Sequence, residues 1–439
     1  MAADSSLTAL SPRDFVAFCR DEDIRRFCLV YDVQTGRVTS SHPQLQPLAD
    51  LVGSDTRDFM QHEGLFFQVT QEHDTLQGAF VHRTRRGQAA GGIRYWHYDT
   101  VEAYLRDGLR LAKGMTRKNA LAGLWWGGGK GVMARDPGVD AGDLETRTYL
   151  YREYGSFISS LRGCYVTAED VGTSVQDMAD IFSHTRFTTC IPGDFGGSGN
   201  PSVPTARGVV SGMEAALDFL ERGDLAGKTV AVQGMGNVGG PLIRFLFEKH
   251  VEKVIACDLD PEVVRNVAEQ HSGLPLEARI AQQGDLSLFA EECDILSPNA
   301  TGAVLNPDTI PKIQAKIVCG AANNQLEDAP RDDCLLFARD IRYVPDFLTN
   351  RMGIVNAANE QYGYVKDDPL FERHLTRDWQ HSIYQTTRRV LHKSCSTATP
   401  SAEIAMHLAD RLSLEEHPIF GHRGRQIIAS LVADRWPET

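Results

Sequence analysis

The feature that most restricts how this chain can fold is a glycine-rich turn set between a short apolar segment and an apolar helix. Residues 228–233 (Lys-Thr-Val-Ala-Val-Gln) are typical of a buried strand, and Gly234-Met235-Gly236-Asn237-Val238-Gly239 follows without a break. In this G-x-G-x-x-G pattern the glycines permit a tight turn, the close approach of a pyrophosphate, and close packing of helix on strand. A helix expected from about Pro241 would offer its unpaired N–H groups to the phosphates. We therefore predict a dinucleotide site formed by Gly234, Gly236, Asn237, Val238 and Gly239.

The next apolar segment suggests which dinucleotide binds. Residues 254–258 read as a second strand that ends in Asp258, at the distance where an acid accepts a hydrogen bond from the adenosine ribose 2′-OH. A carboxylate there repels a 2′-phosphate, and Leu259-Asp260 offers no arginine to hold one. We therefore expect NAD rather than NADP. The alternative interpretation is a plain glycine turn followed by an aspartate that caps a helix.

The chain around this motif divides into regions of different character. Residues 1–57 predict a small N-terminal extension, with a β-hairpin at 27–39, and residues 101–113 predict a helix that leads into a lysine-containing segment. Residues 192–204 are rich in Gly, Ser, Asn and Pro, as a hinge between domains would be. From there to about residue 341, strands and helices alternate, which predicts an α/β fold with a parallel sheet. The tail from about residue 371 is helical, with a break around Pro400.

Two lysines stand close together in the N-terminal half. Lys118 lies in Gly114-Met115-Thr116-Arg117-Lys118-Asn119-Ala120, and Lys130 follows Gly127-Gly128-Gly129. Glycine lets backbone approach a ligand closely, and two nearby ammonium groups lower the pKa of at least one of them toward that of a general base. This arrangement suits the binding and deprotonation of a small anionic substrate. The alternative is a glycine-rich surface turn with two solvated lysines.

Composition limits the possible partners. The net charge of −13 argues against nucleic acid and against an anionic membrane surface, and no apolar run approaches the ~20 residues that span a bilayer. Residues 1–12 lack the basic and apolar segments of a signal peptide. Nine cysteines without a Cys-x-x-Cys pair fit reduced thiols in the cytoplasm, and fourteen histidines form no His-Glu-x-x-His spacing, so we expect no metal.

Several motifs together give the chain a recognisable resemblance over roughly residues 60–415. It resembles the glutamate/leucine/phenylalanine/valine dehydrogenase family, and most closely its leucine, phenylalanine and valine branch. The segments that carry the resemblance are Gly91-Gly92-Ile93-Arg94, 114–120, 127–130, Tyr165-Val166-Thr167-Ala168-Glu169-Asp170-Val171-Gly172-Thr173, Gly199-Asn200-Pro201-Ser202, 234–239, Ala322-Asn323-Asn324-Gln325-Leu326 and Gly353-Ile354-Val355-Asn356-Ala357-Ala358.

The resemblance implies reversible oxidative deamination of an L-amino acid to a 2-oxo acid and ammonia, with NAD accepting the hydride. It implies that Lys118 binds the substrate α-carboxylate, that Lys130 is the general base acting on water, and that Asp170 moves protons to and from the substrate nitrogen. Such a reaction needs a base that titrates near neutrality and a carboxylate beside the nitrogen. The further substrate-binding residues that it implies are Ala90, Gly91, Gly92, Met115, Asn324, Ile354 and Ala357. The further cofactor-binding residues are Thr205, Asn299, Ala300 and, again, Asn324.

The resemblance also implies an architecture of two domains. After the extension at 1–57, an α/β substrate domain would cover 58–195 and a Rossmann NAD-binding domain 196–370, and helices at 371–439 would return to the substrate domain. The cleft between the domains would close over the reactants and exclude water. A homo-oligomer is expected, but the N-terminal extension could change the octamer of the family.

Two positions bear on the substrate side chain. Glutamate-specific members carry a lysine where this chain has Ala90 and a serine where it has Ala357, so an acidic side chain would be buried unpaired at a cost of several kcal/mol. We expect an apolar substrate, and two alanines favour one of phenylalanine or tryptophan size. Asn350-Arg351-Met352-Gly353 departs from the family's Asn-Ala-Gly-Gly and would bring bulk and a charge beside the pocket. The alternatives are a dehydrogenase for an unusual biosynthetic amino acid and a non-catalytic NAD-binding regulator.

Overall fold

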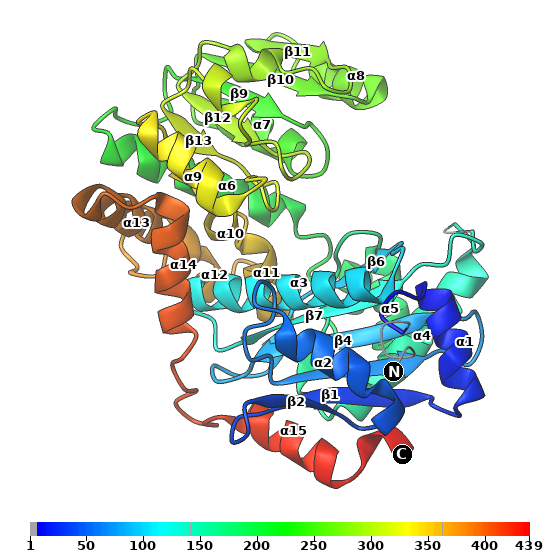
Figure 1. The fold of residues 1–439 in the computed structure, drawn as a ribbon. Coiled ribbons are helices and arrows are strands. Elements are labelled where there is room, and N and C mark those ends of the chain that lie inside the picture. Colours follow the sequence, from blue (N-terminus) through cyan, green and yellow to red (C-terminus); the bar gives the residue numbers. More distant parts are fainter. Residues whose placement is uncertain (1–6, 141, 362) are drawn as a thin grey trace. The chain divides into compact units, whose positions relative to one another are not determined.

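The computed structural model of the protein describes residues 7–140, 142–361 and 363–439. The chain forms two compact units, each of which gathers segments that are distant in the sequence (Figure 1). Unit 1 contains residues 1–200, 357–364 and 410–439, and unit 2 contains residues 201–356 and 365–409. Residues 1–6 of the expected N-terminal extension lie outside the described part of the chain.

Unit 1 is built on a mixed sheet. Within the described residues its strands are ordered β2-β1-β3-β4-β7-β5-β8, and β6 also pairs with β7. The strands are β1 (Arg26–Asp32), β2 (Arg37–Ser40), β3 (Gly64–Val69), β4 (Leu76–Arg83), β5 (Ala89–Ala90), β6 (Ile93–Trp96), β7 (Gly127–Ala134) and β8 (Tyr165–Val166). The expected hairpin is confirmed, because β1 and β2 pair antiparallel around Gly36, which adopts a left-handed φ of 69°. Neighbouring strands in the run β2-β1-β3-β4-β7 pair antiparallel, whereas β5 and β6 both run parallel to β7.

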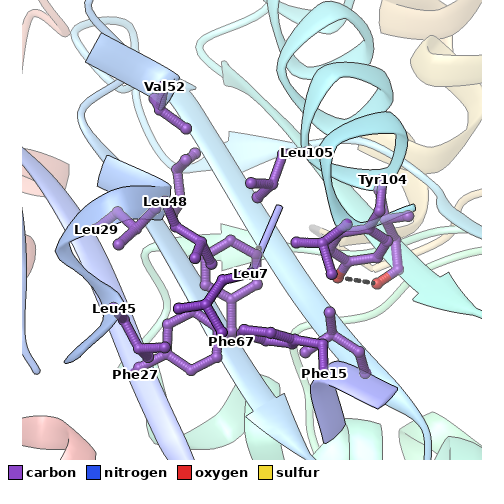
Figure 2. Packing of buried hydrophobic residues seen from close by; sticks show 14 of the residues in the cluster. Leu7, Phe15, Phe27, Leu29, Leu45, Leu48, Val52, Phe67, Tyr104 and Leu105 are labelled. Atoms are coloured by element: carbon purple, nitrogen blue, oxygen red, sulfur yellow. Dashed lines mark hydrogen bonds between the residues drawn. The ribbon is translucent and has the colours of Figure 1, made fainter. Parts of the chain in front are cut away.

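The residues expected to form an N-terminal extension are part of the core of unit 1. Strand β1 pairs with β3, so the hairpin extends the main sheet. Phe27 of β1 stacks on Phe67 of β3 with ring centroids 4.6 Å apart, in a cluster that also contains Leu7, Phe15 and Tyr104 (Figure 2). Burial of each such side chain contributes about 1.5–3 kcal/mol to stability. Within residues 7–57, the expected extension thus contributes a strand and core side chains to unit 1.

Helix α3 is longer than the apolar spacing indicated. It begins after Thr100, whose side chain accepts a hydrogen bond from the Ala103 N–H (3.1 Å), and it continues past residue 113 to Leu121, so it contains Lys118. It packs on β7 and β4, where glycines allow close contact: a Cβ at Gly108 would lie 2.3 Å from the Phe80 ring. The other α-helices of unit 1 are α1 (Pro12–Asp21), α2 (Gln46–Ser54), α4 (Leu144–Ser160), α5 (Val175–Phe182) and α15 (Arg423–Ala433).

Unit 2 confirms the predicted parallel sheet. Its strands, in the order β11-β10-β9-β12-β13-β14, all run parallel, and relative to their order along the chain this is the 3-2-1-4-5-6 arrangement of the dinucleotide-binding fold. The strands are β9 (Thr229–Gln233), β10 (Lys253–Asp258), β11 (Leu276–Ile280), β12 (Ile295–Pro298), β13 (Ile317–Cys319) and β14 (Arg342–Val344). Helix α6 (Ser202–Phe219) precedes the first of these strands, and α7 (Gly239–Glu248), α8 (Pro261–Gln270) and α9 (Ala329–Ala338) lie between later ones.

The C-terminal helices divide between the units. Helices α13 (Ile383–Thr397) and α14 (Ser401–Leu412) are separated by the predicted break, where Ala398 adopts a left-handed φ of 51°. The chain belongs to unit 2 up to Ala409 and returns to unit 1 at Asp410, which is later than the expected boundary at residue 371. Trp436 packs on Phe66 in unit 1 and donates a hydrogen bond to Ser160 Oγ (3.0 Å), which fixes the end of the chain there. The remaining α-helices are α10 (Asp346–Thr349), α11 (Met352–Gln361) and α12 (Pro369–Glu372).

Short 3₁₀ turns complete the described structure. They are η1 (Pro43–Leu45), η2 (Gly193–Phe195), η3 (Ser287–Ala290), η4 (Ile310–Lys312), η5 (Arg373–Leu375) and η6 (Trp436–Glu438). Of the described helices, none is both long enough and apolar enough to cross a membrane. The nine cysteines are free thiols.

Candidate active site

Lys130 lies on a buried strand, which excludes the surface-turn interpretation. It sits on β7 opposite Phe80 of β4, and its side chain is only 4% exposed. The three preceding glycines serve packing rather than the expected approach of a ligand. A Cβ at Gly127 would lie 2.1 Å from the Arg83 carbonyl oxygen, and one at Gly128 would lie 2.0 Å from Thr116 Oγ1 of α3. Glycine is therefore required here because protein atoms occupy the space.

Asp170 reaches Lys130 from the loop that follows β8. Lys130 Nζ lies 2.7 Å from Asp170 Oδ2, and Arg94 Nε lies 3.4 Å from the same oxygen. Arg94 also pairs with Asp107 of α3 at 3.1 Å, and Tyr98 Oη donates to that carboxylate at 2.7 Å. Lys130, Asp170, Arg94 and Asp107 thus form a largely buried chain of alternating charges, and Arg110 pairs with the far end of it at Asp107 (2.6 Å).

This chain of charges shifts the pKa values of both central groups. Burial lowers the pKa of the Lys130 ammonium; the negative charge of Asp170 offsets part of this effect, and the positive charge of Arg94 adds to it. Burial alone would raise the pKa of the Asp170 carboxyl, but Lys130 and Arg94 hold that pKa below its usual range. The sequence led us to expect that a second lysine would lower the Lys130 pKa. Instead, burial and the positive charge of Arg94 are what lower the pKa of Lys130.

Gly91 and Gly92 connect two short strands beside Lys130. They lie between β5 and β6, and the Gly131 N–H donates to the Gly92 carbonyl at 3.2 Å. A Cβ on Gly92 would lie 2.5 Å from the Glu169 carbonyl oxygen and 2.7 Å from Asp170 Cβ. Because residue 92 has no side chain, the loop that carries Asp170 can pack directly against the backbone there.

Helix α3 brings further candidate residues to this region. Met115 Cγ would lie 2.8 Å from a Cβ on Gly91, and Asn119 Nδ2 donates to the Ala90 carbonyl at 3.3 Å. Lys118 lies between these two residues in the sequence, in the last turn of the helix, and is half-buried. Residues 90–92, 115 and 118 thus belong to the same part of unit 1 as Lys130 and Asp170.

Arg94 and Asp107 were not expected as site residues, whereas Asp170 was. Arg94 stands in the Gly91-Gly92-Ile93-Arg94 motif, two residues after Gly92, and this position is the one signal that the sequence offers for it. Nothing in the local sequence pointed to Asp107 or Tyr98, because their contact with Arg94 depends on how α3 packs.

The glycine-rich turn of unit 2 has the geometry of a phosphate cradle. Gly234 adopts a left-handed φ of 88°, and a Cβ on Gly239 would lie 1.9 Å from the Gly234 carbonyl oxygen. Gly236 and Asn237 are exposed, Val238 is half-buried, and no atom of the described chain comes within 4 Å of a Cβ built on Gly236. Helix α7 begins at Gly239, earlier than the expected Pro241, and no described side chain caps it. Open space before uncapped N–H groups fits a pyrophosphate.

Other predicted cofactor residues surround this turn. Asp258 ends β10, and its carboxylate accepts a hydrogen bond from the Met235 N–H at 2.7 Å. Ala300 packs within 2.9 Å of a Cβ built on Gly234, and Asn299 is held by its amide N–H donating to the Ser297 carbonyl at 2.9 Å. The residues present therefore fit a dinucleotide.

Two more predicted cofactor residues of unit 2 lie outside the 234–239 turn in the sequence. Asn324 has a left-handed φ of 53°, and its N–H donates to Asp346 Oδ2 at 2.6 Å. Thr205 lies in α6, and its hydroxyl donates to the Pro201 carbonyl at 2.9 Å.

The residues expected near the substrate side chain belong to both units. Ala90 on β5 and Ala357 on α11 are buried residues of unit 1, whereas Ile354 belongs to unit 2. Arg351 is fully buried in unit 2, and its guanidinium donates to the His381 carbonyl. Burial lowers its pKa to about 9. The Met352 side chain packs against Gly208 of α6.

Among residues 7–140, 142–361 and 363–439, no group of three or more His, Cys, Asp and Glu side chains could hold a metal ion.

Known proteins resemble this chain over most of its length. Residues 65–187 match the family model described as Glu/Leu/Phe/Val dehydrogenase, dimerisation domain, and residues 196–409 match Glutamate/Leucine/Phenylalanine/Valine dehydrogenase. The leucine dehydrogenase of Geobacillus stearothermophilus is 44% identical over 70% of this chain and 80% of its own length. The valine dehydrogenase of Streptomyces coelicolor is 38% identical over 77% of this chain and 88% of its own length.

A solved structure agrees with these relatives. The L-tryptophan dehydrogenase of Nostoc punctiforme superimposes with a TM-score of 0.66 at 32% identity, covering 80% of this chain and 95% of that one. The chain therefore belongs to the glutamate/leucine/phenylalanine/valine dehydrogenase family.

Proposed function

We propose that this protein is an NAD-dependent dehydrogenase that deaminates apolar L-amino acids to 2-oxo acids and ammonia. The observation that carries the proposal is the buried ion pair of Lys130 and Asp170, flanked by Arg94. Burial lowers the pKa of Lys130 from the ordinary lysine value, which favours its use as a general base. Relatives that act on leucine and valine, and a structural relative that acts on tryptophan, support the reaction type.

The residues divide the chemistry among them. Lys118 binds the substrate α-carboxylate as a point charge, with Gly91, Gly92 and Met115 around it. The 234–239 turn would hold NAD, which would supply the acceptor for the hydride that leaves the substrate α-carbon. Neutral Lys130 takes a proton from the water that attacks the resulting iminium carbon, and Asp170 carries protons to and from the nitrogen until ammonia leaves.

The cofactor side is proposed to involve Gly234, Gly236, Asn237, Val238, Gly239, Asp258, Asn299 and Ala300, with Thr205 and Asn324 near the nicotinamide. Asp258 favours NAD because its charge would repel a 2′-phosphate. Arg279 on the neighbouring strand β11 is paired with Glu277 and Glu291, which leaves its charge neutralised.

Replacing Asp258 with Asn should shift cofactor preference. The amide can still accept from the Met235 N–H but carries no charge, so we expect the ratio of kcat/KM for NAD over NADP to fall about 10- to 100-fold, equivalent to about 1–3 kcal/mol. Steady-state kinetics with both cofactors measures the ratio. The same change at the exposed Asp260, Asp260→Asn, serves as the matched control and should leave the ratio unchanged. An unchanged ratio in Asp258→Asn would refute the role of this carboxylate.

Substrate size is tested by a panel of valine, leucine, phenylalanine, tryptophan and glutamate. We expect NADH and ammonia from the apolar amino acids, the highest kcat/KM for phenylalanine or tryptophan, and none from glutamate. Ala90→Leu should move the preference toward smaller side chains, because the added isopropyl group takes up space in the pocket. Highest kcat/KM for valine would contradict the large pocket, and turnover of no amino acid would contradict the function.

Two further proposals concern the oligomeric state of the enzyme and its location in the cell. We infer a homo-oligomer from the match of residues 65–187 to a dimerisation domain. We infer a cytoplasmic location, supported by nine free thiols in a protein of this reaction class.

A further inference from the structure

Glu169, the neighbour of Asp170, has a carboxyl group that the mechanism above leaves unused. Its Oε1 accepts a hydrogen bond from Asn200 Nδ2 at 3.3 Å. Its Oε2 is buried and meets no hydrogen-bond donor among the described residues. A buried carboxylate oxygen without a donor costs free energy. Such a group in a catalytic loop requires an explanation.

The surroundings of Glu169 differ from those of Asp170. Asp170 faces two cations, Lys130 and Arg94, whereas the charged neighbours of Glu169 are the carboxylates of Asp177 on α5 and of Asp170 itself. The Cys190 thiol also faces it, with its own pKa raised to about 12 by burial. Burial first, and then these two carboxylates, raise the pKa of Glu169 to about 7, although the Asn200 hydrogen bond opposes the shift.

Asn200 occupies a particular place in the chain. It is the last residue of unit 1, and the chain enters unit 2 at Pro201, just before α6. The segment before it is fastened within unit 1 by Glu360, whose carboxylate accepts from the Cys190 N–H (2.8 Å), the Ser198 N–H (2.9 Å) and the Ser198 hydroxyl (2.6 Å). Asn200, itself exposed, thus directly follows a segment that Glu360 holds within unit 1, and it bonds the Asp170 loop from there.

We propose that Glu169 is a positioning residue. Its ionised carboxylate holds the Asp170 loop to Asn200, so that the Asp170 carboxylate stays in contact with the Lys130 ammonium. The inference rests on the proposed function. The backbone supports it, since the Glu169 carbonyl oxygen occupies the space beside Gly92 and any movement of residue 169 moves Asp170 with it. A carboxylate accepts a stronger hydrogen bond than a protonated carboxyl does.

The direction of the pH effect follows from the raised pKa. A carboxyl whose pKa is raised on folding favours the folded state below its unfolded value and loses that contribution as pH rises through the folded value near 7. Ionised Glu169 therefore costs stability above pH 7 while it supports activity there. Stability and activity should respond in opposite directions when the charge is removed.

The test compares Glu169→Gln, Asn200→Ala and wild type across a pH range that spans neutrality. At about pH 8 we expect Glu169→Gln to lower kcat about tenfold with an unchanged KM for NAD, and to raise Tm by roughly 2 °C. The wild-type kcat should fall as pH drops through an ionisation near 7 that Glu169→Gln lacks. Asn200→Ala should reproduce the loss in kcat.

A matched control is available on α4. Glu153 is also a buried glutamate of unit 1 with a raised pKa, and it accepts a hydrogen bond from the Gln71 N–H at 3.0 Å, away from the Asp170 loop. Glu153→Gln should leave the pH profile of kcat unchanged. Wild-type kcat and an unchanged ionisation in Glu169→Gln would overturn the proposal, as would parallel losses of kcat and Tm. A wild-type protein without turnover would instead refute the function itself.

Discussion

Replacing Lys130 with methionine is expected to lower kcat for amino-acid deamination by about 10²–10⁴-fold, the range for loss of a general base. Methionine has a similar length and suits a site that is 4% exposed, so β7 should keep its structure. Asp170 would retain Arg94 as its cationic partner. The measurement is steady-state kinetics, with circular dichroism to compare the folds.

The control for this change is Lys113→Met on α3. Lys113 Nζ donates to the Arg57 carbonyl at 2.8 Å, and the residue takes no part in the ion-pair chain. Its replacement should leave kcat near the wild-type value. If Lys130→Met kept kcat within a few-fold of wild type while Lys113→Met behaved the same way, Lys130 would not be the base.

A companion variant separates the two members of the pair. Asp170→Asn removes the negative charge that raises the pKa of Lys130, so the pKa of Lys130 should fall further. The pH at which residual activity appears would then move downward, even though kcat falls because the proton carrier is lost. A shift in the opposite direction would show that Asp170 does not face Lys130.

Replacing Gly92 with alanine should lower kcat about 100-fold or more. The added Cβ would lie 2.5 Å from the Glu169 carbonyl oxygen and 2.7 Å from Asp170 Cβ, so the catalytic loop has to move. A displacement of about 1 Å in a catalytic group can cost about 10²-fold in rate, and overpacking costs about 1–3 kcal/mol of stability. Kinetics and thermal unfolding measure the two effects.

Gly53→Ala provides the comparison for this change. Gly53 lies in α2, and a Cβ there would meet Val38 at ordinary contact distances of 3.6–3.8 Å. This variant should keep full activity and gain about 0.5–1 kcal/mol, because alanine favours the helix. Equal activity in Gly92→Ala and Gly53→Ala would mean that the Asp170 loop does not depend on residue 92.

The parts of the fold that could be predicted from sequence are those with local signals. Strands β9 and β10, with the glycine turn between β9 and α7, follow from apolar runs, glycine spacing and a terminal aspartate, which are properties of neighbouring residues. The hairpin of β1 and β2 follows from Gly36 in the same way. Resemblance, rather than pattern, supplied the roles of Lys118, Lys130 and Asp170.

The parts that could not be predicted depend on tertiary packing. Gly127–Gly129 have the composition of a loop, yet they form a buried strand because Arg83, Thr116 and Tyr165 fill the space beside them. The apolar spacing of α3 stops near residue 113, although contact with β7 stabilises the helix to Leu121. The effect of Arg94 on the pKa of Lys130 could be predicted only by knowing that β6 pairs with β7. No pattern of neighbouring residues gives that pairing.

The central requirement of the proposed mechanism is that Lys130 acts as a base in its neutral form beside Asp170. The pH dependence of kcat/KM for the preferred apolar amino acid tests this requirement most directly. In wild type, kcat/KM for deamination should rise with pH through an ionisation below the ordinary lysine value of 10.5, and this ionisation should be absent from Lys130→Met. The same ionisation in both proteins, or a kcat/KM that does not change with pH over this range, would contradict the assignment of Lys130 as the base.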